Sequence, residues 1–211
     1  FHGNEFAKAL NLAWETMRPV LRNTPELIKR YQAKLVVDYQ KALDTVHADE
    51  DKGARLFVEI CLAGKPGYKE VTDSRARLRE VSDPALRKGE LAACVSPDVG
   101  VDYFDDLAKI YRATSPGAKA ETQAARLDHA RGNVAAALAR LHKVLKYDPR
   151  FLKSQIEAAA RAIEDISKAG EAKLAEALQG ADKVLGRETA RRIAKDYAGT
   201  EAGKKALEAS K

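Results

Sequence analysis

Apolar residues that recur at helical spacing place the strongest constraint on this chain. In the clearest stretch, four aliphatic residues follow steps of four, three and four and so share one stripe of a helix: Val134, Leu138, Leu141 and Leu145. Gly132 and Asn133 separate them from an earlier apolar run and are suited to end one helix and begin the next. Asp148 and Pro149 stop the second helix. Residues 118–149 are therefore predicted to form two helices folded back on each other.

The N-terminal part of the chain is predicted to hold further helices. A first helix carries the stripe Phe6, Leu10, Ala13 and Met17. Thr24 and Pro25 are suited to begin a long second helix that reaches His47. The apolar run 56–62 fits either a buried strand or a helix, and a helix is favoured because no second strand-like run is present to pair with it.

Breaks in the pattern predict where the remaining helices end. The region 68–99 is expected to hold two short helices, with Asp83 and Pro84 beginning the second. In the last third of the sequence, three apolar stripes follow one another, and Gly170 and Gly186 are expected to end the first and second of them.

Together these stretches predict an all-α fold of about nine to ten helices with no significant β-sheet. Short connections favour a helical-repeat stack, a right-handed α-solenoid or a bundle. The pattern is irregular over residues 1–100 and regular over 101–211, which suggests an N-terminal helical region followed by helical repeats, or one continuous domain. No run approaches the roughly 18 to 20 apolar residues of a membrane span.

An internal sequence echo indicates repetition. Seven residues recur 86 positions later, so that Tyr111, Thr114 and Gly117 correspond to Tyr197, Thr200 and Gly203; the full first copy is Ala108, Lys109, Tyr111, Thr114, Gly117, Lys119 and Ala120. In both copies we expect the tyrosine to close one helix and the threonine to cap the next.

The stretch 118–149 resembles a tetratricopeptide repeat of 34 residues. The repeat's glycine, alanine, large apolar, aliphatic and closing proline positions are occupied by Gly132, Ala137, Leu141, Leu145 and Pro149. The second copy of the echo is similar to the turn between repeats in bacterial tetratricopeptide-like proteins. The first half departs from the pattern, with Glu121 at the aromatic position, Ala125 at the glycine and Asp128 at the tyrosine. The resemblance implies stacked helix pairs with a groove for protein partners.

The excess of positive over negative charge is confined to the C-terminal part of the chain. Residues 1–117 carry 18 Lys and Arg against 18 Asp and Glu, whereas 118–211 carry 19 against 13, which accounts for the net charge of +6. A basic cluster stands out there: Arg187, Arg191, Arg192, Lys195, Lys204 and Lys205. These side chains either form solvated faces neutralised by Glu188, Asp196 and Glu201, or bind a protein partner, nucleic acid or an anionic surface. No aromatic residues for base stacking are interleaved with them.

Residue types that carry catalysis or bind metals do not form a recognisable pattern. Cys61 and Cys94 each fall on an apolar stripe, which predicts buried free thiols, or a disulfide if the protein is exported. The four histidines have no metal-binding spacing, and neither a phosphate-binding glycine loop nor a nucleophile elbow is present. No cofactor, metal or catalytic site is expected.

The sequence therefore favours a non-enzymatic protein-binding scaffold or assembly subunit without a membrane span. Its partner would be a protein of unidentified kind, and nucleic acid or an anionic surface is the alternative ligand for the basic cluster. The chain begins at Phe1 instead of methionine, as a removed export signal or a trimmed boundary would leave it. An exported, periplasmic location is favoured over the cytoplasm.

Overall fold

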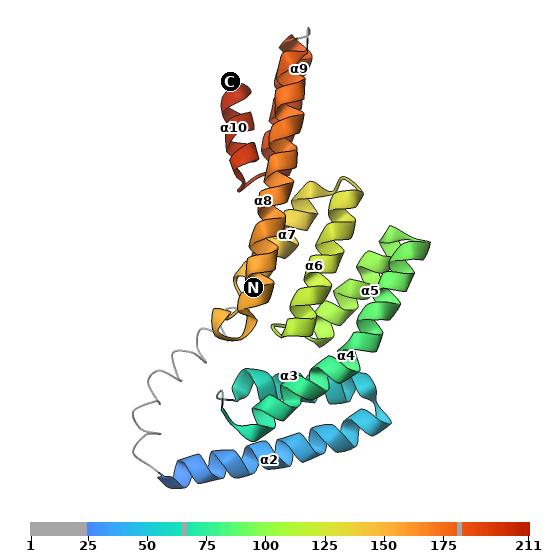
Figure 1. The fold of residues 1–211 in the computed structure, drawn as a ribbon, viewed down its shortest axis with the longest axis vertical. Helices are drawn as coiled ribbons and strands as arrows, with labels where there is room; N and C mark the ends of the chain where they lie inside the picture. Colours follow the sequence, from blue (N-terminus) through green and yellow to red (C-terminus); the bar gives the residue numbers. More distant parts are fainter. Residues whose placement is uncertain (1–24, 65–66, 181–182) are drawn as a thin grey trace. The chain divides into compact units, whose positions relative to one another are not determined.

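The computed structural model describes residues 25–64, 67–180 and 183–211. Within these ranges the chain forms nine α-helices and no strand (Figure 1), which confirms the predicted all-α class. The helices are α2 (Pro25–Ala48), α3 (Glu50–Ala63), α4 (Lys69–Val95), α5 (Pro97–Ile110), α6 (Ser115–Ala130), α7 (Val134–Leu145), α8 (Pro149–Gln179), α9 (Lys183–Asp196) and α10 (Glu201–Ala209). The predicted first helix, which carries Phe6 to Met17, lies outside the described residues.

Two compact units divide the chain, one reaching to Arg75 and the other beginning at Ala76. The boundary between them lies inside α4. Sequence reasoning placed its division at residue 100, where the apolar pattern becomes regular.

The first unit is built on the helix pair α2 and α3. Asp49 is the N-cap residue of α3, and its carboxylate accepts a hydrogen bond from the backbone N–H of Lys52 at 3.0 Å. The rings of Tyr39 on α2 and Phe57 on α3 lie 5.8 Å apart between centroids. The apolar run 56–62 is helical, as predicted, and it contributes the buried core of α3: Phe57, Val58, Ile60 and Cys61.

α4 continues through Pro84, so the prediction of two short helices in this region was wrong. Proline lacks the N–H that an interior helical residue donates, and it disfavours a helical residue before it. Packing outweighs that cost here. Leu78, Ser82 and Leu86 recur every four residues on both sides of the proline and are all buried, so one buried face of α4 continues past the proline.

Two glycines expected to end helices lie inside them instead. Gly170 is within α8 and Gly186 is within α9. A Cβ atom at Gly170 would come within 2.5 Å of the Tyr197 ring, and one at Gly186 within 2.9 Å of the Ala177 carbonyl oxygen. The missing side chains allow helices to approach each other closely. Gly170 and Gly186 therefore mark positions where helices pack closely and not positions where helices end.

The second unit is a stack in which each helix from α5 to α10 packs against the next in the chain. Alternate helices also contact each other, α6 with α8 and α8 with α10. α6 begins at Ser115 and α8 begins at Pro149, 34 residues later. The core is formed by small and aliphatic side chains, among them Ala118, Ala125, Ala137, Leu138, Leu141, Val144, Ala159, Ala190 and Ile193.

The sequence echo corresponds to two turns of the same geometry, one before α6 and one before α10. Tyr111 and Tyr197 are each 2% exposed. The Thr114 hydroxyl donates to the Tyr111 carbonyl oxygen at 2.5 Å, and the Thr200 hydroxyl donates to the Tyr197 carbonyl oxygen at 2.7 Å. Gly117 and Gly203 lie against the same tyrosine carbonyls, so that an added Cβ would collide with them.

The two turns differ in their caps and at the residue before the threonine. The Thr200 hydroxyl oxygen accepts a hydrogen bond from the Gly203 N–H at 3.2 Å, whereas the Thr114 side chain, contrary to expectation, forms no such cap. The residue before the capping threonine is Ala113 in the first turn and Gly199 in the second, with φ of 52° and 84°. This left-handed conformation costs an L-residue with a Cβ roughly 1–2 kcal/mol, whereas glycine adopts it freely.

This difference predicts opposite effects for exchanging the two residues. Ala113→Gly should raise the free energy of unfolding by about 0.5–1 kcal/mol, because relief of strain exceeds the added entropy of the unfolded chain. Gly199→Ala should lower it by about 1 kcal/mol, measured by urea titration. Ala139→Gly, at an exposed position inside α7, is the control and should destabilise by about 0.5–1 kcal/mol. Destabilisation by Ala113→Gly equal to that of the control would contradict this account of the turn.

Candidate functional site

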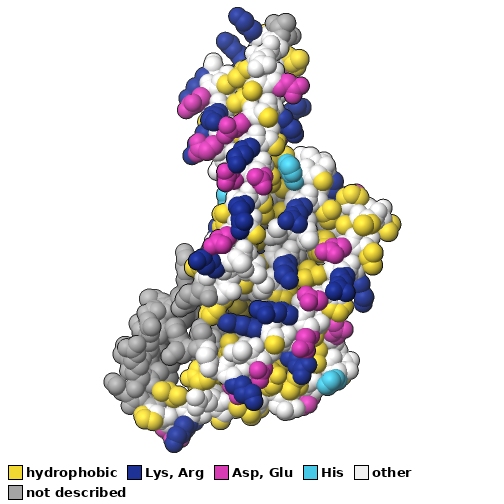
Figure 2. Space-filling view, viewed as in Figure 1, with side chains coloured by type: hydrophobic (Ala, Val, Ile, Leu, Met, Phe, Trp, Pro, Cys, Tyr) yellow, Lys and Arg dark blue, Asp and Glu magenta, His cyan; other side chains and the backbone are white. Residues whose placement is uncertain are grey.

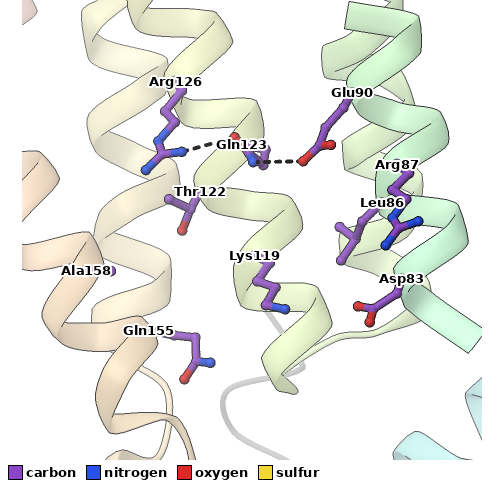
Figure 3. Close-up of a pocket in the computed structure, with 10 residues that line it drawn as sticks. All are labelled: Asp83, Leu86, Arg87, Glu90, Lys119, Thr122, Gln123, Arg126, Gln155 and Ala158. Atoms are coloured by element: carbon purple, nitrogen blue, oxygen red, sulfur yellow. Dashed lines mark hydrogen bonds between the residues drawn. The ribbon is translucent and has the colours of Figure 1, made fainter. Parts of the chain in front are cut away.

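A groove of about 510 Å³ lies in the second unit between α4, α6 and α8 (Figure 3). α6 supplies its middle and the other two helices supply its walls. The lining residues are Asp83, Leu86, Arg87 and Glu90 from α4, Lys119, Thr122, Gln123 and Arg126 from α6, and Gln155 and Ala158 from α8. The groove is formed by segments far apart in the sequence.

Hydrogen bonds between polar side chains join α6 to both walls of the groove, α4 and α8. The Gln123 amide nitrogen donates to the Glu90 carboxylate at 3.5 Å, and the Arg126 guanidinium donates to the Gln123 amide oxygen at 3.4 Å (Figure 3). The Gln155 amide donates to the Ser115 hydroxyl at 2.7 Å. These contacts orient side chains from all three helices towards one space.

The charges of the groove are mixed and accessible to a ligand. Lys119, Arg126 and Arg87 are exposed, as are Asp83 and Glu90, which leaves an excess of one positive charge. Thr122, Gln123 and Gln155 are half-buried and carry hydrogen-bonding groups. This combination suits a polypeptide segment, which presents backbone amides and side chains of both signs.

The opposite side of α6 carries a network of charged residues. The Arg140 guanidinium on α7 donates to Asp128 on α6 at 2.7 Å and forms two hydrogen bonds with Asp105 on α5. Glu121 lies 3.6 Å from the same guanidinium and is paired with Lys143. Glu121 and Asp128 are only 2% and 3% exposed, so their charges depend on these cations for compensation.

The ionisation of two groups reflects this environment. Hydrogen bonding to Asp105, and next to Asp128, raises the pKa of Arg140 above its usual value, so the guanidinium stays charged at every physiological pH. Burial raises the pKa of the Tyr147 hydroxyl to about 12, and the nearby Glu121 carboxylate adds to the shift. The phenol is therefore neutral in the folded protein.

The residues proposed from the sequence as repeat-packing residues lie in the α6–α7 pair and at the start of α8. Gly132 has φ of 83° in the turn before α7, and Pro149 begins α8. Ala137 and Leu141 are fully buried, and Leu145 is half-buried at the edge of the same core.

The structure separates the predicted basic cluster into two groups. Lys204 and Lys205 lie on α10 and are ion-paired with Glu201 and Glu171, both at 2.6 Å. The other four lie exposed on α9: Arg187, Arg191, Arg192 and Lys195. In the part of the chain that the structure describes, none of these four forms an ion pair, and neither do Glu188 and Asp196. The uncompensated charge is therefore on α9.

The two cysteines differ in environment. Both are free thiols; Cys61 is buried as predicted, whereas Cys94 is exposed, which corrects the expectation that it is buried. Burial raises the pKa of the Cys61 thiol to about 11, so that thiol is protonated at neutral pH. The two residues belong to different units, and the structure contains no disulfide between them.

The described residues show neither a metal-binding cluster nor a helix that could span a membrane. Among the described residues, no group of three or more His, Cys, Asp or Glu side chains is arranged to hold a metal ion. Over the same ranges, no helix combines the length and apolar character needed to cross a bilayer.

Sequence reasoning missed both the groove and the charged network. The signal for the groove was the polar face of α6, where Lys119, Thr122 and Arg126 follow helical spacing. The signal for the network was the departure from the repeat pattern, because Glu121 and Asp128 stand at positions that face a core.

Comparison with known proteins adds no assignment. Neither a protein-family model, nor a curated protein, nor a solved structure matches this chain.

The network predicts a large effect of removing its central cation. Arg140→Met should lower the free energy of unfolding by about 3 kcal/mol, because Asp128 and Glu121 would lose a cation while remaining buried. Lys109→Met, which breaks the exposed pair with Asp106, is the control and should have no measurable effect. Chemical denaturation of both variants measures the difference. Equal stability of the two variants would show that the network does not hold the helices together.

Proposed function

We propose that this protein is a non-enzymatic protein-binding scaffold or assembly subunit whose ligand is a polypeptide segment. The observation that carries the proposal is the groove between α4, α6 and α8. Its exposed charges of both signs and its half-buried amide groups supply hydrogen-bond donors and acceptors for a peptide backbone.

The arrangement of the second unit supports a tetratricopeptide-like origin for this groove. Helix pairs are stacked, α6 and α8 begin 34 residues apart, and alternate helices contact each other. Stacking of this kind leaves an extended surface formed by the same helix of each successive pair. The departures at Glu121 and Asp128 are compatible with such a repeat, because their ion pairs with Lys143 and Arg140 replace aromatic packing between α6 and α7.

Nucleic-acid binding through α9 is the alternative function. It is supported by one observation, the four exposed cations of α9 that lack ion pairs with described residues. Phosphate contacts require such side chains. No aromatic residue lies between them in the sequence, which disfavours recognition of single-stranded bases.

Two matched double substitutions distinguish the groove from α9. Lys119→Glu with Arg126→Glu reverses two charges in the groove, and Arg187→Glu with Arg191→Glu reverses two on α9. Both lower the net charge by the same amount. Immobilised wild-type chain should retain a protein partner from an extract of its source cells. The groove variant should retain at least about tenfold less, because reversed charges repel the partner's complementary groups. The α9 variant should retain as much as wild type.

The reverse result would contradict the proposal. If the groove variant retains the partner and the α9 variant loses it, the binding surface is α9. Binding of a random-sequence DNA or RNA duplex that weakens with salt and disappears in the α9 variant would favour the nucleic-acid function. Circular dichroism and thermal unfolding of both variants check that the fold is retained.

A further inference from the structure

Large apolar side chains are exposed where α8 ends and α9 begins. Leu178 on α8 is 50% exposed, and Val184 and Leu185 on α9 are 70% and 61% exposed. Hydrophobic and basic side chains lie next to each other over this end of the second unit (Figure 2). Exposed apolar residues that are close together mark surfaces that bind a partner or a membrane.

The cations of α9 continue from this apolar end along one side of the helix. Lys183, Arg187, Arg191 and Lys195 follow one another at intervals of four residues, about 6 Å of helix rise each. All four are exposed. Lys183 extends the basic cluster recognised in the sequence by one turn, towards the exposed apolar residues.

Apolar and basic side chains share the outward side of α9. At about 100° per residue, Arg187, Arg191 and Lys195 lie within roughly 80° of the circumference, with Val184 between them. The opposite side is buried through Gly186, Ala190 and Ile193. We call this outward side the α9 outer face; it consists of Val184, Leu185, Arg187, Glu188, Arg191, Arg192 and Lys195.

The charge of the α9 outer face is available to an external anion. The face carries four cations, which are Arg187, Arg191, Arg192 and Lys195. None of them forms an ion pair with any residue that the structure describes, whereas Lys204 and Lys205 on the next helix are paired with carboxylates. Glu188 is the one exposed carboxylate on described α9 positions. The face therefore combines excess positive charge with exposed aliphatic side chains.

We propose that the α9 outer face binds an anionic lipid surface. An anionic bilayer offers both phosphate or carboxylate groups for the cations and an apolar layer for Val184 and Leu185. A nucleic-acid backbone would satisfy the cations and leave those two side chains in water. The protein then lies on the membrane without crossing it. This binding is separate from the groove, so it would bring the proposed scaffold to a membrane surface.

Vesicle co-sedimentation of the full chain tests the proposal. Vesicles of phosphatidylcholine with about 30% phosphatidylserine are compared with vesicles of phosphatidylcholine alone, at 100 mM salt. Wild type should bind the anionic vesicles at least about tenfold more tightly. Arg187→Glu with Arg191→Glu should weaken that binding by about thirtyfold or more, since each cation near an anionic surface contributes about a factor of five.

A second variant separates lipid insertion from charge alone. Val184→Ser with Leu185→Ser keeps the net charge and should weaken anionic-vesicle binding by about fivefold. Both side chains are exposed, so the variant is expected to keep its fold, which thermal unfolding checks. Lys119→Glu with Arg126→Glu, the groove variant of equal charge change, should bind vesicles as wild type does.

Three results would overturn the proposal. They are equal affinity of wild type for anionic and neutral vesicles, no effect of the serine variant, and equal loss of binding in the groove and α9 variants. A serine variant that binds normally while a DNA duplex competes with the vesicles would assign the face to nucleic acid. If the groove variant captures the partner as well as wild type does, the proposed function fails but the vesicle results are unaffected. The two proposals can therefore be tested independently.

Discussion

The second unit depends on the charged network centred on Arg140. One guanidinium on α7 contacts carboxylates on α5 and α6, so three consecutive helices are joined at a single side chain. Two carboxylates of the network are almost completely buried, and an uncompensated charge in that position would be costly. The network therefore restricts α5, α6 and α7 to one mutual arrangement, in which the other face of α6 is turned towards the groove.

Small side chains determine how closely these helices approach. Alanines line the interfaces of α6 and α7, and Ala118, Ala125 and Ala137 are almost completely buried. Gly117 and Gly203 allow a helix to begin directly against the carbonyl oxygen of a buried tyrosine. Few large side chains are needed in such a core, which accounts for the low aromatic content of 6%. Close packing is also sensitive to added volume, because interiors have few voids to absorb it.

Much of the fold could be predicted from the sequence because helical periodicity is a local property. The stripe of Val134, Leu138 and Leu141 and the turns at Tyr111 and Tyr197 are found where the pattern indicated. Local signals failed at Pro84 and at the glycines within α8 and α9, because packing between helices overrode them.

The candidate surfaces were less predictable than the helices. The groove requires knowledge of which helices are neighbours, since α4, α6 and α8 are separated by other helices in the chain. The basic residues of α9 were recognisable as a cluster, but their exposure beside Val184 and Leu185 depends on which side of α9 is buried. The ion pair of Lys205 likewise depends on Glu171, which lies on another helix, whereas Lys204 pairs with Glu201 three residues earlier on its own helix.

Site-specific photo-crosslinking tests the central claim, that a polypeptide occupies the groove, most directly. Ala158 lines the groove and Ala139 lies on the exposed side of α7; both are exposed alanines, so replacing either with benzoylphenylalanine removes no charge or hydrogen bond. Illumination in an extract of the source cells is expected to yield a discrete covalent protein adduct from position 158 and none from 139. An adduct from position 139 alone, or the same adduct from both, would contradict the assignment of the groove as the binding site.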